Sequence, residues 1–129
     1  MAKAILLVDD EEMIREVVQE KLSHSAEVFY HANNGVEALR LLQAHSDIAV
    51  VISDMKMPVM DGAQFIKEAR TQGFKQPFII FTAYATGETL NEVRTHGVHA
   101  FIEKGQTEGL LEALASCLQS PRALVNGVQ

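Results

Sequence analysis

The chain has 129 residues, 47% of them hydrophobic, which is enough for one compact domain with a full apolar core. Its formal net charge of −6, without a cluster of Lys and Arg, argues against direct binding of nucleic acid. A single cysteine excludes an internal disulfide, and the apolar run at residues 4–8 is too short for a signal peptide or a membrane span, so we expect a cytoplasmic protein.

Short apolar runs alternate with segments of helical period along the chain. In chain order, the pattern predicts strand 4–8, helix 11–22, strand 28–30, helix 36–44, strand 48–53, a helix capped by Asp61, strand 78–81, helix 87–96, strand 100–102 and a last helix from about residue 107 to Pro121.

This alternation predicts an α/β fold of the flavodoxin-like, doubly wound kind. Its five-stranded parallel sheet would have the order 2-1-3-4-5, with right-handed crossovers and helices on both faces. We expect residues 1–120 to form this domain and residues 121–129 to be a tail or the start of a linker.

Polar residues follow four of the five predicted strands. Asp9 and Asp10 come after the first strand, Asp54 after the third, Thr82 ends the fourth, and Lys104 comes after the fifth. Each is ordinary alone, as a solvated charge or a turn residue. In a sheet of this order, however, the carboxyl ends of the strands meet at one edge, where ligands bind. We therefore expect the five residues to form one site.

The charges at this edge indicate its chemistry. Three carboxylates would repel one another unless a divalent cation and the Lys104 ammonium offset them. Mg²⁺ prefers hard oxygen ligands of this kind, and a carboxylate is able to attack phosphorus and form an acyl phosphate. The sequence therefore predicts a metal-dependent phosphoryl-transfer site.

Four segments resemble the response-regulator receiver domain of two-component signalling, in the family's order and spacing over about residues 3–119. They are the acidic pair in ILLVDDE (5–11), the acceptor segment VISDMKMPVMDG (51–62), the switch strand FTA (81–83) and the lysine segment GVHAFIEK (97–104). The second of these is the most specific match.

The resemblance implies that Asp54 is phosphorylated. Asp10 and Asp54 would bind Mg²⁺, or Mn²⁺ in its place, through their carboxylates. Asp9 would help through water, and the backbone carbonyl of Lys56 would be a further ligand. The domain would catalyse its own phosphorylation and dephosphorylation, without being an enzyme that releases an external product.

The resemblance also implies a switch. Lys104 and Thr82 would contact the phosphoryl group, and Phe101 would turn inward in the active state. These changes would remodel the face made by the fourth helix, fifth strand and fifth helix. Lys56 and Tyr84 occupy positions that the family uses to tune the lifetime of the phosphoryl group.

The implied donor is a histidine kinase or a histidine phosphotransfer protein, with small acyl phosphates as substitutes. The resemblance implies that the signal passes to a downstream protein or to a fused output domain. Members of the family often dimerise on activation. The chain departs from the family at Gly105, where a proline usually follows the lysine.

Three alternatives stay open at this point. A metal-dependent phosphohydrolase also uses a nucleophilic Asp, although residues 9–12 lack its Asp-x-Asp-x-Thr pattern. A flavodoxin would need a phosphate cradle that the first loop lacks. A receiver-like module that only binds proteins, without phosphorylation, is the third, and Gly105 keeps it open.

Overall fold

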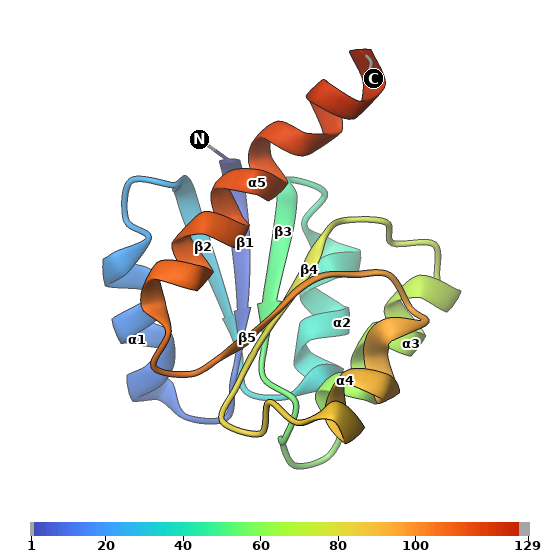
Figure 1. The fold of residues 1–129 in the computed structure, drawn as a ribbon. Helices are drawn as coiled ribbons and strands as arrows, with labels where there is room; N and C mark the ends of the chain where they lie inside the picture. Colours follow the sequence, from blue (N-terminus) through green and yellow to red (C-terminus); the bar gives the residue numbers. More distant parts are fainter. Residues whose placement is uncertain (1, 127–129) are drawn as a thin grey trace.

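The computed structural model of the chain describes residues 2–126, with side chains up to residue 118. Strands and helices alternate in the order β1 (Ala2–Val8), α1 (Glu12–Lys21), β2 (Ala26–Ala32), α2 (Gly35–Ala44), β3 (Ile48–Ser53), α3 (Gly62–Thr71), β4 (Phe78–Thr82), α4 (Gly87–Arg94), β5 (Val98–Glu103) and α5 (Thr107–Asn126). The strands form one parallel sheet of order β2-β1-β3-β4-β5, which confirms the predicted fold class (Figure 1). No helix in residues 2–126 is long and apolar enough to cross a membrane.

The sheet separates two apolar cores, because neighbouring residues of a strand face opposite sides. In β1, Ile5 and Leu7 pack with residues of α1 and α5, whereas Leu6 and Val8 pack with residues of α2, α3 and α4. Figure 1 shows these two helical layers on either side of the sheet. Burial on both faces explains the continuous apolar runs of β1 and β3, residues 4–8 and 48–52.

The central strands match the predicted ranges better than the edge strands. β3 has the predicted bounds, whereas β2 and β5 each extend beyond the predicted core of three residues. Both lie at a sheet edge, where polar residues such as Glu27, His31 and His99 interrupt the apolar run. Pairing with β1 or β4 continues through these residues, so the backbone ladder is longer than the apolar pattern.

Side-chain caps fix the first residues of α2 and α3. The Asp61 carboxylate accepts a hydrogen bond from the Gln64 amide at 2.9 Å, which confirms the predicted cap of α3. Asn34 caps α2 in the same way through the Glu37 amide.

The last helix is longer than predicted. α5 continues through Pro121 to Asn126, so the prediction that this proline ends the helix was wrong. A proline ring fixes φ near the helical value, and a helix that passes through it forgoes one backbone hydrogen bond. The assignment of residues 121–129 as a tail or linker stays a prediction, and residues 127–129 lie outside the described residues.

Candidate functional site

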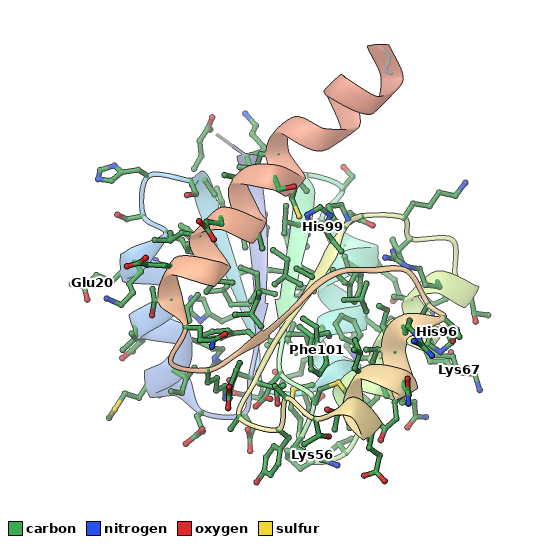
Figure 2. The ribbon with its side chains drawn as sticks, in the orientation of Figure 1. Glu20, Lys56, Lys67, His96, His99 and Phe101 are labelled. Carbon is green, nitrogen blue, oxygen red and sulfur yellow. The ribbon has the colours of Figure 1, made fainter. Side chains whose placement is uncertain are left out.

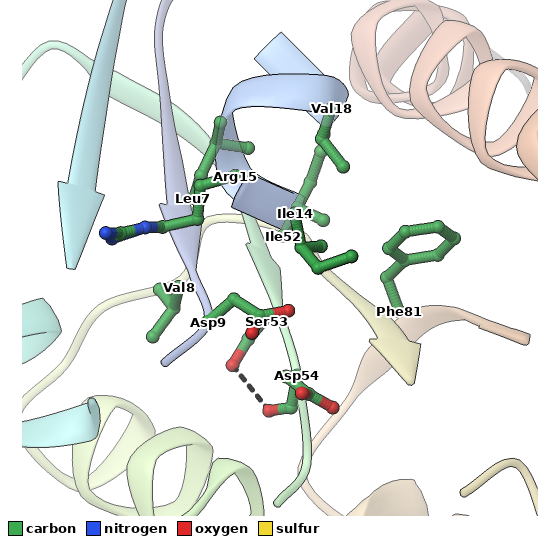
Figure 3. A pocket seen from close by; sticks show the side chains of 10 residues that line it. All are labelled: Leu7, Val8, Asp9, Ile14, Arg15, Val18, Ile52, Ser53, Asp54 and Phe81. Atoms are coloured by element: carbon green, nitrogen blue, oxygen red, sulfur yellow. Dashed lines mark hydrogen bonds between the residues drawn. The ribbon is translucent and has the colours of Figure 1, made fainter. Parts of the chain in front are cut away.

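Adjacent parallel strands bring the predicted site residues to one edge of the sheet. Val8 of β1 pairs with Ser53 of β3, so Asp9 and Asp54 follow at the same level (Figure 3). The Asp54 amide donates to the Val8 carbonyl at 2.9 Å, which carries the ladder one residue beyond β3. Across β4 and β5, the Lys104 amide donates to the Thr82 carbonyl at 2.8 Å.

The Lys104 ammonium joins the carboxylates across this edge. Its Nζ lies 2.8 Å from Oδ2 of Asp9 and 3.0 Å from Oδ2 of Asp54. Glu11 adds a weaker, exposed contact at 3.9 Å. Lys104, at the end of β5, therefore bridges residues at the ends of β1 and β3 that are far apart in the sequence.

Burial opposes the charged forms of the groups in this site. Asp9 is 5% exposed and Asp54 6% exposed. Burial raises the pKa of the Asp9 carboxyl, and the hydrogen bond from Lys104 only partly opposes this effect. Burial also works against the charge of Lys104, but hydrogen bonds to Asp9 and Asp54 outweigh it and raise the pKa of the ammonium.

The three aspartates form a set that fits a small divalent cation. Asp9, Asp10 and Asp54 each offer a carboxylate oxygen, and these oxygens lie within 4.8 Å of one another. Asp10 is exposed, which gives access from solvent, whereas the other two are buried. Three negative charges face a single ammonium, so a hard divalent ion with oxygen ligands would balance the site.

Thr82 is positioned at the end of β4 but is engaged elsewhere. Its hydroxyl is fully buried and accepts a hydrogen bond from the Tyr84 amide at 3.1 Å. Among the described residues, no hydrogen bond joins the Thr82 hydroxyl to Asp54 or to Lys104. The structure brings Thr82 to the site's edge, but its hydroxyl is not bonded to the site.

Lys56, in the loop after β3, and Tyr84, in the loop after β4, lie near each other. Nζ of Lys56 lies 5.9 Å from the centroid of the Tyr84 ring, at the limit of a cation–π contact. Lys56 is exposed (Figure 2), and Tyr84 is 54% exposed.

Phe101, on β5, is half-buried and packs against the core beneath α2, α3 and α4 (Figure 2). Gly105 has φ of +102°, a conformation that proline is unable to adopt. The Lys104 side chain nevertheless reaches both aspartates, so the glycine does not prevent the lysine from entering the site.

Sequence reasoning missed the backbone groups that hold the acceptor segment. The Met55 amide donates to Oδ1 of Asp54 at 2.7 Å, and the Gly62 amide donates to the Met55 carbonyl at 2.8 Å. A Cβ on Gly62 would overlap the Asp54 carbonyl oxygen and lie 2.9 Å from Cα of Met55. The glycine after the Asp61 cap was the available signal for this close approach.

Comparison with known proteins gives one consistent family. The model of the response regulator receiver domain matches residues 5–115. The chain is 38% identical over 101 residues to the regulatory protein AtoC of Escherichia coli, covering 78% of this chain and 22% of that protein. It is 30% identical over 119 residues to the chemotaxis protein CheY of Halobacterium salinarum, covering 92% of this chain and 98% of that protein.

Solved structures agree with this result. The chemotaxis protein CheY4 of Vibrio cholerae is 32% identical, with a TM-score of 0.81, and the match covers 91% of this chain and 99% of that one. A signal receiver domain of an HD domain-containing protein from Pseudomonas fluorescens has a TM-score of 0.86 at 26% identity, over 95% of this chain and 99% of that one.

Proposed function

The chain belongs to the response regulator receiver domain family of two-component signalling, and from that premise we propose that Asp54 is its phosphoryl acceptor. The observation that carries the proposal is the position of the Lys104 ammonium, 3.0 Å from Oδ2 of Asp54 and 2.8 Å from Oδ2 of Asp9. The family assignment removes the phosphohydrolase and flavodoxin alternatives.

Topology favours Asp54 over its neighbours. β3 lies between β1 and β4, so Asp54 has the acidic pair on one side and Thr82 on the other. Asp9 and Asp10 have only β2 on their far side, and the sequence there offers no comparable chemical group. A phosphoryl group on Asp54 would therefore reach a metal ion, an ammonium and a hydroxyl from three different strand ends.

In this proposal, Asp10 and Asp54 would bind the ion directly, Asp9 would act through water, and the Lys56 carbonyl would complete the protein's share. Mg²⁺ is the expected ion, with Mn²⁺ as a substitute, because all these donors are hard oxygens. When bound, the ion neutralises the charge on the equatorial oxygens of the transferring phosphoryl group. Lys104, whose Nζ lies 3.0 Å from Oδ2 of Asp54, would neutralise part of the same charge.

The transfer forms a bond from an Asp54 oxygen to phosphorus and breaks the bond between phosphorus and the donor. The proposed donor is a histidine kinase or a histidine phosphotransfer protein, whose imidazole is the leaving group, and small acyl phosphates serve as substitutes. Hydrolysis of the acyl phosphate resets the domain, so its catalysis acts on itself.

The proposed output is a change at the face formed by α4, β5 and α5. Thr82 would turn toward the phosphoryl group and Phe101 would move inward, so that a downstream protein, a fused output domain or a second copy binds the altered face. Phe101 is half-buried, so an inward movement would bury more of its ring.

Lys56 and Tyr84 are proposed to set the lifetime of the phosphoryl group. Each follows a strand-end residue of the site by two positions, Asp54 and Thr82, and the ammonium lies 5.9 Å from the ring centroid, so the pair would limit the entry of the hydrolytic water. Removal of either side chain would then shorten the lifetime without changing the acceptor.

The test is intact mass after incubation with acetyl phosphate and Mg²⁺. We expect a gain of about 80 Da, one phosphoryl group, in the wild type. Asp54→Asn abolishes the gain, a chelator prevents it, and the matched control Asp47→Asn retains it. An equal gain in Asp54→Asn would refute the acceptor. If neither acetyl phosphate nor a phosphotransfer protein labels the wild type, the receiver-like binding module becomes the better account.

A further inference from the structure

The loop between β3 and α3, residues 54–61, carries a backbone group that the proposed metal site needs, the carbonyl of Lys56. On one side of the loop lies an open hollow lined by Asp10, Asp61 and residues 56–58. The side chain of Lys56 is itself exposed. Solvent gives this side of the loop no support, so the support that fixes the carbonyl has to come from the other side.

The first residue of α2 supplies such a support. Gly35 is buried, and its amide donates a hydrogen bond to the Met60 carbonyl at 3.0 Å. Amides in the first turn of a helix have no partner within the helix, so this one is free to bind the loop. Figure 1 shows the start of α2 beside the loop that follows β3. The helix therefore holds the loop by a backbone hydrogen bond.

The side chain of Met60 packs on the same glycine. A Cβ on Gly35 would lie 2.7 Å from Cγ and 2.8 Å from Sδ of Met60, and 2.9 Å from Cβ of Phe65. A larger residue at position 35 would have to displace at least one of these neighbours. The absence of a side chain at Gly35 thus allows the loop and α3 to approach the start of α2 closely.

The residue before Met60 shows that these contacts hold the loop against its own preference. Val59 has a positive φ although it is β-branched, and its side chain is exposed, so packing of that side chain does not explain the conformation. Such a conformation persists only where the surrounding structure imposes it. The two backbone groups of Met60 do so, because the carbonyl is bonded to Gly35 and the amide to the Pro58 carbonyl.

We propose that Gly35 and Met60 are positioning residues of the metal site, and that their contact clamps the loop so that the Lys56 carbonyl is held in place for the ion. The inference rests on the proposed function, because the ion and its Lys56 ligand belong to that proposal. Residues behind the ligands of a metal ion set its affinity by fixing the ligand atoms. Mg²⁺ is especially sensitive to a displaced ligand, since it demands nearly ideal octahedral geometry.

Gly35→Ala tests the clamp by displacing the loop, and a second glycine provides a matched control. Gly87 is the first residue of α4, as Gly35 is of α2, and each follows a side-chain cap. A Cβ on Gly87 meets nothing within 4 Å. We expect Gly35→Ala to raise the dissociation constant of Mg²⁺ about tenfold and Gly87→Ala to leave it unchanged. A Mg²⁺ titration followed by the NMR amide shifts of residues 54–62 measures the constant.

Met60→Ala tests the same contact from the side of the loop. Alone, it should raise the dissociation constant of Mg²⁺ several-fold, since the packing on Gly35 is lost. Added to Gly35→Ala, it should restore part of the affinity, because it removes the overlap with Met60 and leaves only that with Phe65. Met57→Ala is the control, because Met57 is half-buried in the same loop and is the neighbour of Lys56. Nearness to the ligand would make Met57→Ala the more harmful variant, whereas the clamp makes Met60→Ala so.

Hydrogen exchange without metal reads the clamp independently of the ion. The Gly35 amide should exchange about tenfold faster in Met60→Ala than in the wild type, because its partner carbonyl is held less firmly. Leu114→Ala separates positioning from a general loss of stability. Leu114 is 1% exposed in the core on the other side of the sheet, so its truncation should destabilise the fold and leave the dissociation constant of Mg²⁺ unchanged.

Wild-type affinity for Mg²⁺ in folded Gly35→Ala, or an equal loss of affinity in Leu114→Ala, would overturn the proposal. If Gly35→Ala does not fold by circular dichroism, the comparison of Met60→Ala with Met57→Ala decides the same question. A wild type that binds no Mg²⁺ would refute the proposed metal site. Unchanged exchange of the Gly35 amide in metal-free Met60→Ala would instead refute the clamp, so the two failures give different results.

Discussion

The apolar interior and two carboxylates at the carboxyl edge of the sheet are almost equally inaccessible to water, yet burial affects them in opposite ways. Phe65 and Phe78 are fully buried, and removing such apolar surface from water stabilises the fold by about 25 cal/mol per Å². Asp9 and Asp54 are 5% and 6% exposed, and their burial opposes the charges that the site needs.

The difference shows what keeps the edge in place. Lys104 forms ion pairs with the two buried carboxylates, Asp9 and Asp54. Together with Asp10, the site still has three negative charges and one positive charge. Packing of the two cores must therefore supply the stability that the edge does not. Variants in the interior should change stability most, and variants at the edge should change chemistry more than stability.

The largest effect is expected from Phe65→Ala. The Phe65 ring lies 5.2 Å from that of Phe78, between α3 and the sheet, and truncating a fully buried Phe removes about 3–5 kcal/mol from the free energy of unfolding. Urea denaturation measures the loss. Phe74→Ala, at a half-buried ring, is the matched control and should lose less than half as much. Equal losses would show that the interior is not the stabilising region.

The second prediction concerns Gly62, where the core meets the edge. Gly62→Ala places a Cβ against the Asp54 carbonyl oxygen and 2.9 Å from Cα of Met55, and both neighbours are backbone. We expect a loss of about 1–3 kcal/mol in unfolding free energy and weaker Mg²⁺ binding, because the Asp54 segment must shift.

Gly87→Ala is the control for Gly62→Ala. Gly87 begins α4, and a Cβ there meets nothing within 4 Å. Alanine is the better helix former, so this variant should gain up to about 1 kcal/mol. If Gly62→Ala were as stable as Gly87→Ala, the close approach at the acceptor segment would not restrain the edge.

The third prediction tests the charge at the edge directly. At ten times its dissociation constant, Mg²⁺ should raise the unfolding free energy by about 1.4 kcal/mol, since it binds the folded state alone. Asp10→Asn should lose this gain. Asp10 is exposed, so the substitution leaves the cores intact. Denaturation with and without Mg²⁺ measures the gain, and an undiminished gain in Asp10→Asn would exclude that residue as a ligand.

The sequence predicted the parts of the molecule that repeat or cluster. The alternation of apolar and helical segments predicted the parallel sheet, for which we expected the order 2-1-3-4-5, and the bounds of β3 were predicted because burial on both faces makes it apolar up to Ser53. The meeting of Asp9, Asp54 and Lys104 followed from that order, because the carboxyl ends of parallel strands lie together.

The parts that sequence reasoning missed depend on single backbone partners. Arg70 contacts carbonyls 26 and 27 residues away, and no periodicity marks an arginine that binds carbonyls. Thr89 lies in a helix with a weak apolar pattern, so its buried hydroxyl gave no signal. Pro121 misled because a proline ends many helices but does not have to end one.

The smallest effect on stability is expected at Val59, in the loop after β3, where the backbone is strained. Val59 has φ of +69° and is 80% exposed, which is unusual for a β-branched residue. Its neighbour Met60 fixes the loop, because the Met60 carbonyl accepts from the Gly35 amide at 3.0 Å and the Met60 amide donates to the Pro58 carbonyl at 2.7 Å.

Val59→Asn should therefore stabilise the protein by about 0.5–1 kcal/mol, since asparagine tolerates this conformation better than valine. Urea denaturation gives the gain, and labelling by acetyl phosphate should be unchanged. Val17→Asn is the control, because Val17 is exposed on α1 and valine and asparagine have similar helix propensities. This substitution should leave the free energy of unfolding nearly unchanged. A loss of stability in Val59→Asn would mean that the valine side chain, and not the Met60 contacts, fixes this loop. In that case the edge would rely on apolar contacts as the interior does, and the contrast between the two regions would fail at this loop.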